Sequence, residues 1–381
     1  MKNKNKKILI PTGIFPPDIG GPASYVPQIS KYLSIQGYNV TVFTYSDENY
    51  ITDDLLYNFE VVRVQRKLNF ILRELYSLFI LFKLIKNVDL VFANGHFFKS
   101  LMLCKIFRIK FIAKIVGDYS WERAQNRGWT DLNIDNFQTS KKSIFLKLLD
   151  WASKYPIRKA SNVIVPSYYL KNLISKFWAV PSNNISVIYN SFNPSNNEET
   201  YILSPREFKY RAIAINRLVP WKRMENVISA IQYCQDVELI IIGEGPEKQK
   251  LINLANNLGL TKKVNFFGQI SKKYIHSIIG QCDFFILNSS YEGLPHVVLE
   301  SVWAQTPVLA TNVGGTSESF INGKEGILIE MCDPIDLSKK ITEITREIES
   351  FVFEKNNFLE KFSMEKMLTS TEHLLKLNIG D

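Results

Sequence analysis

Two glutamates in the second half of the chain are the first residues whose surroundings suggest chemistry. Glu300 lies inside the apolar run 296–304, and Glu292 precedes it by eight residues in a loop that follows a strand-like run. A carboxylate buried without a partner costs on the order of several kcal/mol, so Glu300 requires a hydrogen-bond donor. A ligand hydroxyl is one such donor, and a structural ion pair is the alternative. Pro295 suits a first helical turn, which places Glu300 in the middle of a helix.

Two cations form a second group. Arg217 and Lys222 lie five residues apart across a turn that contains Pro220, just after another strand-like run. A guanidinium binds phosphate oxygens in a forked geometry and an ammonium acts as a compact charge, so this pair suits a diphosphate. Ordinary solvated surface cations are the alternative. Arg223 follows Lys222 directly, which leaves open which of these two cations turns inward.

Two glycines form a third group. Gly20 and Gly21 lie where the first strand-like run gives way to a helical pattern. Glycine permits unusual dihedral angles and a close approach of the backbone to a ligand, and the free N–H groups of a helix N-terminus bind phosphate. A plain strand-to-helix turn is the alternative. The spacing is not GxGxxG, so a dinucleotide-dependent oxidoreductase is disfavoured.

These groups need a framework that brings strand ends together, and the hydrophobic pattern predicts one. Short runs rich in Val, Ile, Leu and Phe alternate with longer amphipathic stretches in both halves of the chain. Near-continuous apolar runs indicate strands covered on both faces, and helices between them indicate parallel order. We therefore predict an α/β protein of two doubly wound, Rossmann-like domains. Their predicted bounds are 1–189 and 209–361, with a linker at 190–208 and a closing helix at about 362–381.

Length and composition agree with two ordinary globular domains. The chain has 381 residues, of which 46% are hydrophobic and 22% charged, which excludes collagen-like, low-complexity and wholly disordered classes. The four cysteines show no metal-ligand spacing and fit a reducing compartment. The basic start lacks a long apolar run and a cleavage site, so we expect a cytoplasmic protein. Carboxylate pairs such as Asp53 and Asp54 resemble solvated surface groups, so no metal is expected.

The net charge of +9 is concentrated in the first half, where residues 1–200 hold 26 Lys and Arg against 15 Asp and Glu. A basic half suggests an anionic partner. Zinc-finger spacing and an RNP-like strand are both absent from the sequence, so no nucleic-acid partner is expected. Segments 66–87 and 97–114 combine cations with Leu, Ile and Phe, which favours peripheral docking onto anionic lipid at the inner membrane face. Core helices with charged edges are the alternative.

Several motifs together resemble one enzyme family. The segments EGLPHVVLE and TPVLATNVGGTSE, preceded by INRLVPWK, are similar to the retaining glycosyltransferases of family 4, which have the GT-B fold. GGPASYV near the start, GEGP and FFGQIS extend the similarity over nearly the whole chain. The resemblance implies two domains facing across a cleft, in which the first binds the acceptor and the second binds a nucleotide sugar.

The resemblance also assigns roles to matching residues of the second domain. It implies that Glu300 binds the ribose hydroxyls and that Glu292 lies by the donor sugar. Arg217 and Lys222 match the cations that neutralise the departing diphosphate. The remaining donor-binding positions are the phosphate loop of the first domain, the base-binding segment and the backbone after Glu292, namely Gly20, Gly21, Gly268, Ile270, Gly293, Leu294, Pro295 and His296.

Two residues of the first domain complete the implied site. His96 matches a histidine near the reacting sugar, with a structural histidine as the alternative, and Asp118 matches a group that binds acceptor or sugar. The implied reaction retains the anomeric configuration, and the leaving diphosphate takes the proton of the acceptor. It therefore requires no enzyme nucleophile, cofactor or metal, and depends on stabilising the charge that develops on the leaving group. The implied catalytic set is Glu292, His96, Arg217 and Lys222.

We therefore expect an enzyme that transfers a hexose-type sugar from a nucleotide sugar to a saccharide or lipid-linked acceptor. The expected setting is the synthesis of bacterial cell-surface polysaccharide, lipopolysaccharide or glycolipid. A nucleotide-sugar epimerase of the same fold is one alternative, and it would need its own acid and base groups in place of an acceptor site. A non-catalytic sugar-nucleotide-binding module is another, and the intact residues Glu292, Glu300, Arg217 and Lys222 argue against it.

Overall fold

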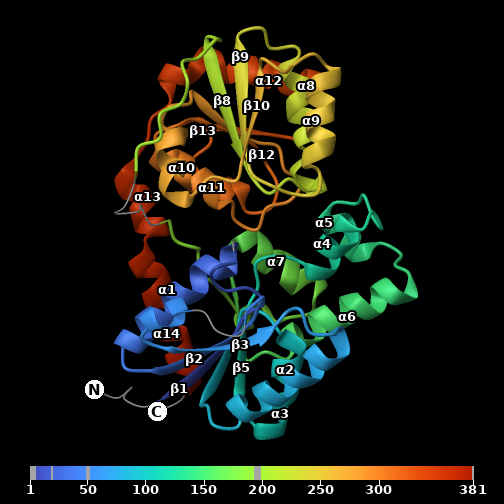
Figure 1. Ribbon diagram of the computed structural model, residues 1–381, viewed down its shortest axis with the longest axis vertical. Helices are drawn as coiled ribbons and strands as arrows, with labels where there is room; N and C mark the ends of the chain where they lie inside the picture. The colour runs from blue at the N-terminus through green and yellow to red at the C-terminus, as the bar shows by residue number, and fades with distance from the viewer. Residues whose placement is uncertain (1–5, 19, 49–51, 193–198, 380–381) are drawn as a thin grey trace.

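Two α/β domains lie one above the other in the protein (Figure 1). The computed structural model describes residues 6–18, 20–48, 52–192 and 199–379. Each domain has one parallel sheet between two layers of helices. The fold class predicted from the hydrophobic pattern is confirmed.

The first sheet, within the described residues, has seven strands in the order β3-β2-β1-β4-β5-β6-β7, all paired in parallel. The strands are β1 (Lys7–Pro11), β2 (Asn39–Ser46), β3 (Glu60–Gln65), β4 (Leu90–Ala93), β5 (Lys110–Lys114), β6 (Asn162–Val165) and β7 (Ile185–Val187). Their β-branched and aromatic residues pack well on a pleated surface. The strand order reverses between β1 and β4, and ligands of doubly wound sheets bind beyond the carboxyl ends of strands at such a point.

The second sheet repeats this plan in the order β10-β9-β8-β11-β12-β13, again with parallel pairs throughout. The strands are β8 (Tyr210–Ile215), β9 (Val237–Ile242), β10 (Val264–Gly268), β11 (Phe284–Leu287), β12 (Val308–Thr311) and β13 (Gly326–Ile329). All six residues of β9 are buried, as expected for a strand covered on both faces. The order reverses between β8 and β11, so the segments after these two strands lie at the switch point.

Helices cover both faces of each sheet. In the first domain they are α1 (Gly21–Ile35), α2 (Phe70–Ile85), α3 (Phe97–Phe107), α4 (Tyr119–Asn126), α5 (Ile134–Thr139), α6 (Ile144–Arg158) and α7 (Tyr168–Phe177). In the second part of the chain they are α8 (Met224–Ile231), α9 (Lys248–Asn257), α10 (Lys272–Ile279), α11 (His296–Trp303), α12 (Pro334–Glu347), α13 (Lys355–Phe362) and α14 (Met364–Ile379). Alternate residues of β1 show the layering: Ile8 and Ile10 pack with α1 and α14, whereas Leu9 packs with α2 and α3.

The chain crosses between the domains twice. The first crossing follows β7 and includes the predicted linker at 190–208, of which residues 193–198 lie outside the described part and the rest forms no helix or strand. The second crossing separates α13, which packs on the second domain, from α14. Leu375 of α14 is fully buried in the first domain, and Tyr32 of α1 donates a hydrogen bond of 2.9 Å to Glu372. The last helix therefore completes the first domain.

Candidate active site

Lys222 and Glu292 meet at the carboxyl edge of the second sheet. Lys222 ends the short 3-10 helix η3 (Pro220–Lys222) after β8, and Glu292 lies in the loop between β11 and α11. The Lys222 ammonium forms an ion pair with Glu292 Oε1, and Ser289 Oγ donates a hydrogen bond of 2.6 Å to the same oxygen. Arg223 is left-handed, with φ of 48°, and forms the N-cap of α8. Lys222 is therefore the cation that faces the carboxylate, which the sequence left open.

Two glycines after β12 hold the backbone of Glu292. Gly315 N donates a hydrogen bond of 2.9 Å to the Glu292 carbonyl oxygen. Gly314 has φ of +58°, and a Cβ at this position would collide with that same oxygen. Only glycine fits position 314 without displacing the loop, because it combines the left-handed conformation with the absence of a side chain. The motif NVGG thus fixes the height of the Glu292 loop above the sheet.

Glu300 has no protein partner. It lies in the second turn of α11, it is partly buried, and its carboxylate makes no hydrogen bond or ion pair within the described residues. Burial raises the pKa of Glu300, and the positive charge of Lys272 on α10 lowers it. Within the described residues, Glu300 does not form the structural ion pair that was the alternative. A ligand hydroxyl is therefore the remaining candidate for its hydrogen-bond donor.

The residues between Glu292 and Glu300 form the start of α11. Leu294 is buried, and Pro295 is the N-cap, so α11 begins one residue later than the sequence suggested. His296 opens the helix, and its side chain is exposed. Desolvation by the neighbouring protein, with the positive charges of Lys272 and Lys114, lowers the pKa of His296 to about 4. Lys114 belongs to β5, so the start of α11 is electrostatically coupled to the first domain.

The segment expected to contact the base lies along the same edge. Gly268 ends β10 with φ of +66°, and its carbonyl accepts a hydrogen bond of 2.8 Å from Gly243 N. Ile270 follows and packs on the core beside α10 and α11. Because β10, β9 and β8 are neighbours, Gly268 and the exposed Arg217 occupy one continuous edge of the sheet.

The first domain contributes the glycines expected to approach phosphate. Gly20 is the N-cap of α1, and a Cβ there would lie 2.7 Å from Ile14 Cδ1, whereas Gly21 has open space around it. No side chain caps α1 and no acidic residue occupies its first turn. The first N–H groups of this helix are therefore open to an anion.

His96 follows β4 and is the N-cap of α3 in a left-handed conformation, with φ of 51°. Its ring packs edge-on to Tyr45 at 4.5 Å and to Phe43 at 5.2 Å. Burial, with the positive charge of Lys99, lowers the pKa of His96 to about 3, so the imidazole is neutral. Its Nε2 is buried and has no hydrogen-bond partner among the described residues. His96 lies after β4 at the switch point of the first sheet, and no hydrogen bond or ion pair joins it to Lys222 or Glu292.

Asp118 has a structural task. Its carboxylate is fully buried and caps α4 by accepting hydrogen bonds from the backbone N–H groups of Ser120 and Trp121 at 3.0 and 3.1 Å. Gln138 donates to its second oxygen at 3.0 Å, and Lys154 lies 3.5 Å away. With both oxygens occupied, Asp118 has no free acceptor for a ligand in this structure, so its expected contact with acceptor or sugar receives no support from the geometry.

An aromatic cluster joins the two domains beside the Glu292 loop. Trp121 of α4 packs against Tyr291 at 5.2 Å and against Trp221 at 5.6 Å between ring centroids. The Tyr291 hydroxyl donates a hydrogen bond of 3.3 Å to the carbonyl of Val116. Gly293 lies so near that carbonyl that a Cβ on it would collide with the oxygen. The loop that carries Glu292 is therefore pressed against the end of β5.

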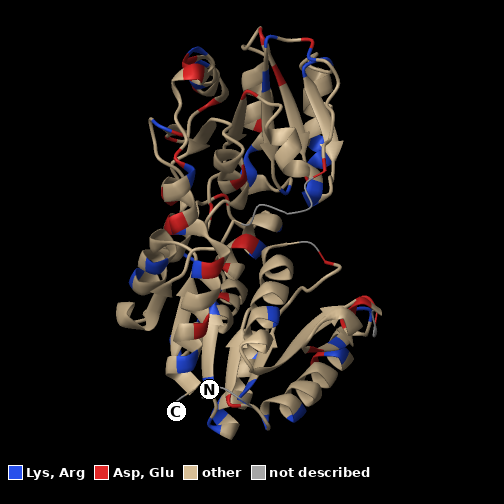
Figure 2. Cartoon of the chain, turned by 90° about the vertical axis from the view of Figure 1, so that its left-hand side faces the viewer, with Lys and Arg blue, Asp and Glu red and all other residues tan. Residues whose placement is uncertain are grey.

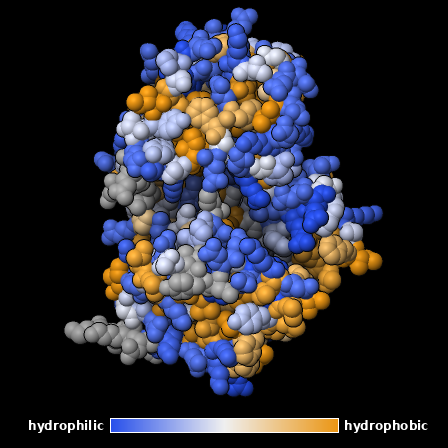
Figure 3. All heavy atoms as spheres, viewed as in Figure 1, coloured by the Kyte–Doolittle hydropathy of each residue, from blue (hydrophilic) through white to orange (hydrophobic). Residues whose placement is uncertain are grey.

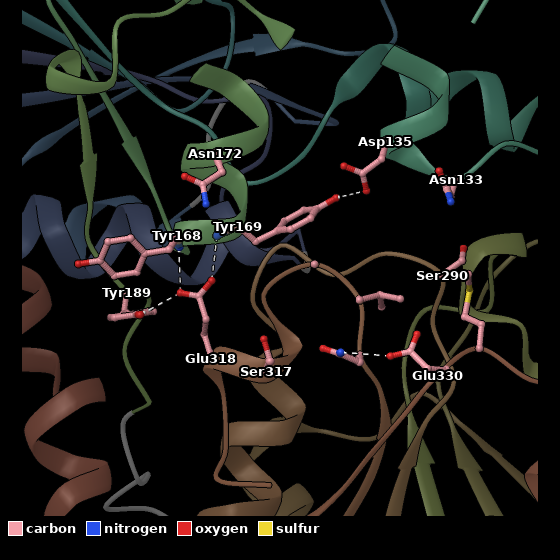
Figure 4. Close-up of a pocket in the computed structure, with 14 residues that line it drawn as sticks. Asn133, Asp135, Tyr168, Tyr169, Asn172, Tyr189, Ser290, Ser317, Glu318 and Glu330 are labelled. Atoms are coloured by element: carbon pink, nitrogen blue, oxygen red, sulfur yellow. Dashed lines mark hydrogen bonds between the residues drawn. The ribbon is translucent and has the colours of Figure 1, made fainter. Parts of the chain in front are cut away.

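A polar pocket lies at the junction of the two domains (Figure 4). Its volume is about 630 Å³, and residues from both domains line it. At its rim the Glu318 carboxylate accepts hydrogen bonds of 2.9 Å from the backbone N–H groups of Tyr168 and Tyr169 and from the Tyr189 hydroxyl. Tyr169 also donates to Asp135 at 2.8 Å. None of the residues expected to bind donor or acceptor lines this pocket.

Two further properties concern metals and membranes. No cluster of three or more His, Cys, Asp or Glu side chains suited to a metal ion occurs in the described part of the chain. Asp54 of the pair noted in the sequence forms an ion pair with Arg63 at 2.7 Å. Among the same residues, no helix combines the length and apolarity that crossing a bilayer requires.

Solved structures define the class of protein. The Anabaena protein Alr3699/HepE, in complex with UDP and glucose, matches with a TM-score of 0.76 at 18% identity, over 97% of this chain and 99% of that one. A glycosyltransferase from Rickettsia africae ESF-5 matches with a TM-score of 0.71 at 19% identity over the full length of both chains. The fold is therefore that of the GT-B class.

Sequence comparison then gives the family. The model of Glycosyltransferase Family 4 matches residues 19–196, and that of Glycosyl transferases group 1 matches residues 197–352. The two matches adjoin and span most of the chain, so the protein belongs to the group 1/family 4 glycosyltransferases, and the resemblance noted in the sequence is confirmed.

Curated relatives agree with this assignment. The uncharacterized glycosyltransferase MJ1178 of Methanocaldococcus jannaschii is 30% identical over 218 residues, which cover 56% of this chain and 58% of that protein. MJ1069 of the same organism is 25% identical over 361 residues, or 89% of each chain. The lipopolysaccharide core biosynthesis glycosyltransferase LpsE of Rhizobium meliloti is 30% identical over 136 residues, or 35% of this chain and 39% of LpsE.

Proposed function

We propose that this glycosyltransferase is a retaining enzyme that moves a hexose-type sugar from a nucleotide sugar to a saccharide or lipid-linked acceptor in cell-surface glycan synthesis. The observation that carries the proposal is the ion pair of Lys222 with Glu292 at the carboxyl edge of the second sheet, followed by a helix whose Glu300 has no partner among the described residues. The complex of the Anabaena relative with UDP and glucose supports a nucleotide-sugar donor, and the likeness to LpsE supports a saccharide acceptor.

Each residue of this edge has a role in the proposed reaction. Glu300 accepts hydrogen bonds from the ribose hydroxyls, which supply the partner that its partly buried carboxylate lacks. Lys222 and Arg217 offset the negative charge that grows on the leaving diphosphate, and the first turn of α1 adds N–H groups when the domains close. Glu292 holds the Lys222 ammonium in place and lies by the donor sugar.

The proposed chemistry needs no enzyme nucleophile. The acceptor hydroxyl attacks the anomeric carbon while the bond to the diphosphate breaks, and a diphosphate oxygen takes the acceptor proton on the same face, so the configuration is retained. With its low pKa, His96 stays neutral and serves as a hydrogen-bonding group rather than as an acid. We propose that no metal or other cofactor takes part, and full activity after dialysis against EDTA is the expected result.

The first test is a thermal-shift panel of nucleoside diphosphates and nucleotide sugars. Ligand binding to the folded state raises the apparent stability by mass action, by about 2.7 kcal/mol at a ligand concentration of 100 Kd. We expect one nucleoside diphosphate and one of its sugar esters to stand out. Nuclear magnetic resonance of the product's anomeric proton then tests retention, and an inverted product would refute it.

Replacing the ribose-binding acid provides the matching prediction. Glu300→Ala should abolish the shift caused by the selected nucleotide, because Glu300 is the acid expected to hold the ribose hydroxyls. Glu349→Ala is the control, since Glu349 is exposed and lies in the short helix η5 (Ile348–Ser350) after α12. An unchanged shift in Glu300→Ala would remove Glu300 from the donor site.

We further propose that the first domain docks on an anionic membrane through α2, α3 and α6. Only Ser77, Leu81 and Ile85 of α2 are buried, so α2 is not a core helix with charged edges. Large apolar side chains are exposed along all three helices, namely Phe70, Ile71, Leu72, Leu75, Phe79, Met102, Ile106, Ile144, Phe145 and Leu148. Figure 3 shows hydrophobic surface over the lower part of the first domain. Figure 2 shows Lys and Arg positions on the helices of the same domain.

Sedimentation with lipid vesicles tests this surface. Apolar burial and the attraction of Lys and Arg to anionic headgroups act together, so binding should require anionic lipid and weaken at high salt. The triple variant Leu72→Glu, Leu75→Glu, Phe79→Glu should lose roughly tenfold or more in affinity. Ile335→Glu with Val352→Glu, which changes exposed apolar residues of the second domain, is the control. Equal binding to neutral and anionic vesicles would contradict the proposal.

A further inference from the structure

A carboxylate that the reaction above does not use lies at the junction of the domains. Glu122 is in the first turn of α4, and it is partly buried. Its carboxylate makes no hydrogen bond or ion pair within the described residues. A carboxylate withdrawn from water normally acquires a donor, because leaving it unsatisfied is costly. The capping carboxylate of the same helix, Asp118, has partners at both oxygens, so Glu122 differs from its neighbour.

The backbone around Glu122 fixes where its carboxylate lies. Glu122 Oε1 is so close to Gly117 that a Cβ on this glycine would collide with it. That Cβ would also lie 3.5 Å from the Tyr291 hydroxyl oxygen, so the carboxylate and the second domain meet over Gly117. The next residue toward the helix start, Trp121, is fully buried against Tyr291 and Trp221. The helix is therefore anchored with Glu122 beside the second domain.

The charges around Glu122 come from both domains. Burial, with the negative charge of Asp118, raises the pKa of Glu122 to about 7, and the positive charges of Arg217 and Lys222 oppose this rise. The loop before α11 contributes a second titratable group beside Glu122, the hydroxyl of Tyr291. Burial and the negative charges of Glu122 and Glu292 raise the pKa of Tyr291. Glu122 therefore lies within electrostatic reach of both cations assigned to the diphosphate.

We propose that Glu122 accepts a hydrogen bond from a sugar hydroxyl bound between the domains. The hydroxyl belongs to the donor sugar or to the acceptor, since both must come together beside Lys222 and Glu292. The inference rests on the proposed donor site. A carboxylate suits a neutral hydroxyl, because its two oxygens accept hydrogen bonds and it repels the phosphates themselves. The nearby cations keep enough of the carboxylate ionised at neutral pH for this task.

Glu122→Gln is the test variant, because it keeps the shape of the side chain and removes its charge. Glu349→Gln is the control for a charge change far from the junction. The probes are UDP and UDP-glucose, or the pair that the nucleotide panel selects, with methyl glycosides and a lipid extract as acceptors. UDP should raise the melting temperature of Glu122→Gln at least as much as that of the wild type, since a negative charge near the diphosphate has been removed.

Two outcomes support the proposal, and they distinguish a hydroxyl of the donor sugar from a hydroxyl of the acceptor. If the hydroxyl is on the donor, hydrolysis of UDP-glucose falls at least about tenfold and the sugar ester no longer binds better than UDP. If it is on the acceptor, hydrolysis is kept and kcat/KM for the acceptor falls at least about tenfold. In either case the wild-type rate should rise as pH passes through about 7, where Glu122 ionises, and the rate of Glu122→Gln should not.

The pH dependence of the free energy of unfolding provides an independent test. The folded state holds the Glu122 proton more tightly than the unfolded chain, so the wild-type free energy of unfolding should fall as pH rises from 4.5 to about 7, relative to Glu122→Gln. Glu122→Asp, which keeps the charge but shortens the side chain, should lose the sugar contact in the same assays.

Rates, affinities and pH profiles of Glu122→Gln that all stay within about twofold of Glu349→Gln would overturn the proposal. If Glu300→Ala keeps its UDP shift while Glu122→Gln loses transfer, the ribose role of Glu300 fails and the role of Glu122 stands.

Discussion

At the scale of single residues, the ion pair of Lys222 with Glu292 is the contact that aims a positive charge at the proposed diphosphate site. Lys222→Met should lower kcat by roughly 100-fold, because a preorganised charge that stabilises a developing anion contributes about that much. Its melting temperature should fall far less than its rate. Lys339→Met, which breaks an exposed pair with Asp336 at 2.7 Å, is the control. Steady-state kinetics and thermal unfolding provide the two measurements, and a Lys222→Met enzyme with full rate would contradict the assignment.

Some residues of the candidate site could be predicted from the sequence and others could not. Arg217, Glu292 and Glu300 stand out in the sequence because each follows or interrupts an apolar run, and that pattern is local. Which cation faces Glu292 depends on the left-handed backbone of Arg223, which the letters Lys-Arg do not encode. The position of Glu122 depends on how α4 packs against the second domain, and no local pattern in the first domain reports such a contact.

At the scale of elements, the loop between β11 and α11 packs so closely on the segment after β5 that no side chain fits at Gly293. Gly293→Ala places a methyl group against the Val116 carbonyl oxygen and should push the domains apart. Misplacement of reacting groups by about 1 Å costs roughly 100-fold in rate, so activity should fall by at least tenfold while each domain still folds. Gly13→Ala, where a Cβ meets nothing within 4 Å, is the control. Wild-type kinetics for Gly293→Ala would show that the junction tolerates a shift.

Helices and strands could be predicted from the sequence where a local hydrophobic pattern marks them. Strands form where runs of buried β-branched and aromatic residues predict them, whereas β7, within the predicted first domain, has only three residues and was not distinguished as a strand. The exposed apolar face of α2 could not be distinguished from a core face by periodicity. Its burial depends on what covers it, and only Ser77, Leu81 and Ile85 are covered.

At the scale of the whole molecule, Glu318 ties the second domain to the first. Its carboxylate caps α7 of the other domain through two backbone N–H groups, and it accepts a third hydrogen bond from Tyr189. Burial and the hydrogen bond to Glu318 raise the pKa of the Tyr189 hydroxyl. A negative charge at a helix N-terminus contributes about 0.3–1 kcal/mol, and up to about 2 kcal/mol when partly buried. The junction is therefore held both by Glu318 and by the ring contacts of Trp121 with Tyr291 and Trp221.

Glu318→Ala should therefore loosen the junction without unfolding either domain. We expect a larger radius of gyration by small-angle X-ray scattering in the absence of ligand, and weaker nucleotide binding, because closure then starts from a wider set of domain orientations. Asp333→Ala is the matched control, since Asp333 caps α12 within a single domain through a hydrogen bond of 2.9 Å to Asp336 N. Both variants lose one cap and a similar amount of stability, about 1 kcal/mol, but only Glu318→Ala should change the scattering. Identical scattering from the two variants would mean that the aromatic contacts of Trp121 and Tyr291 hold the domains by themselves.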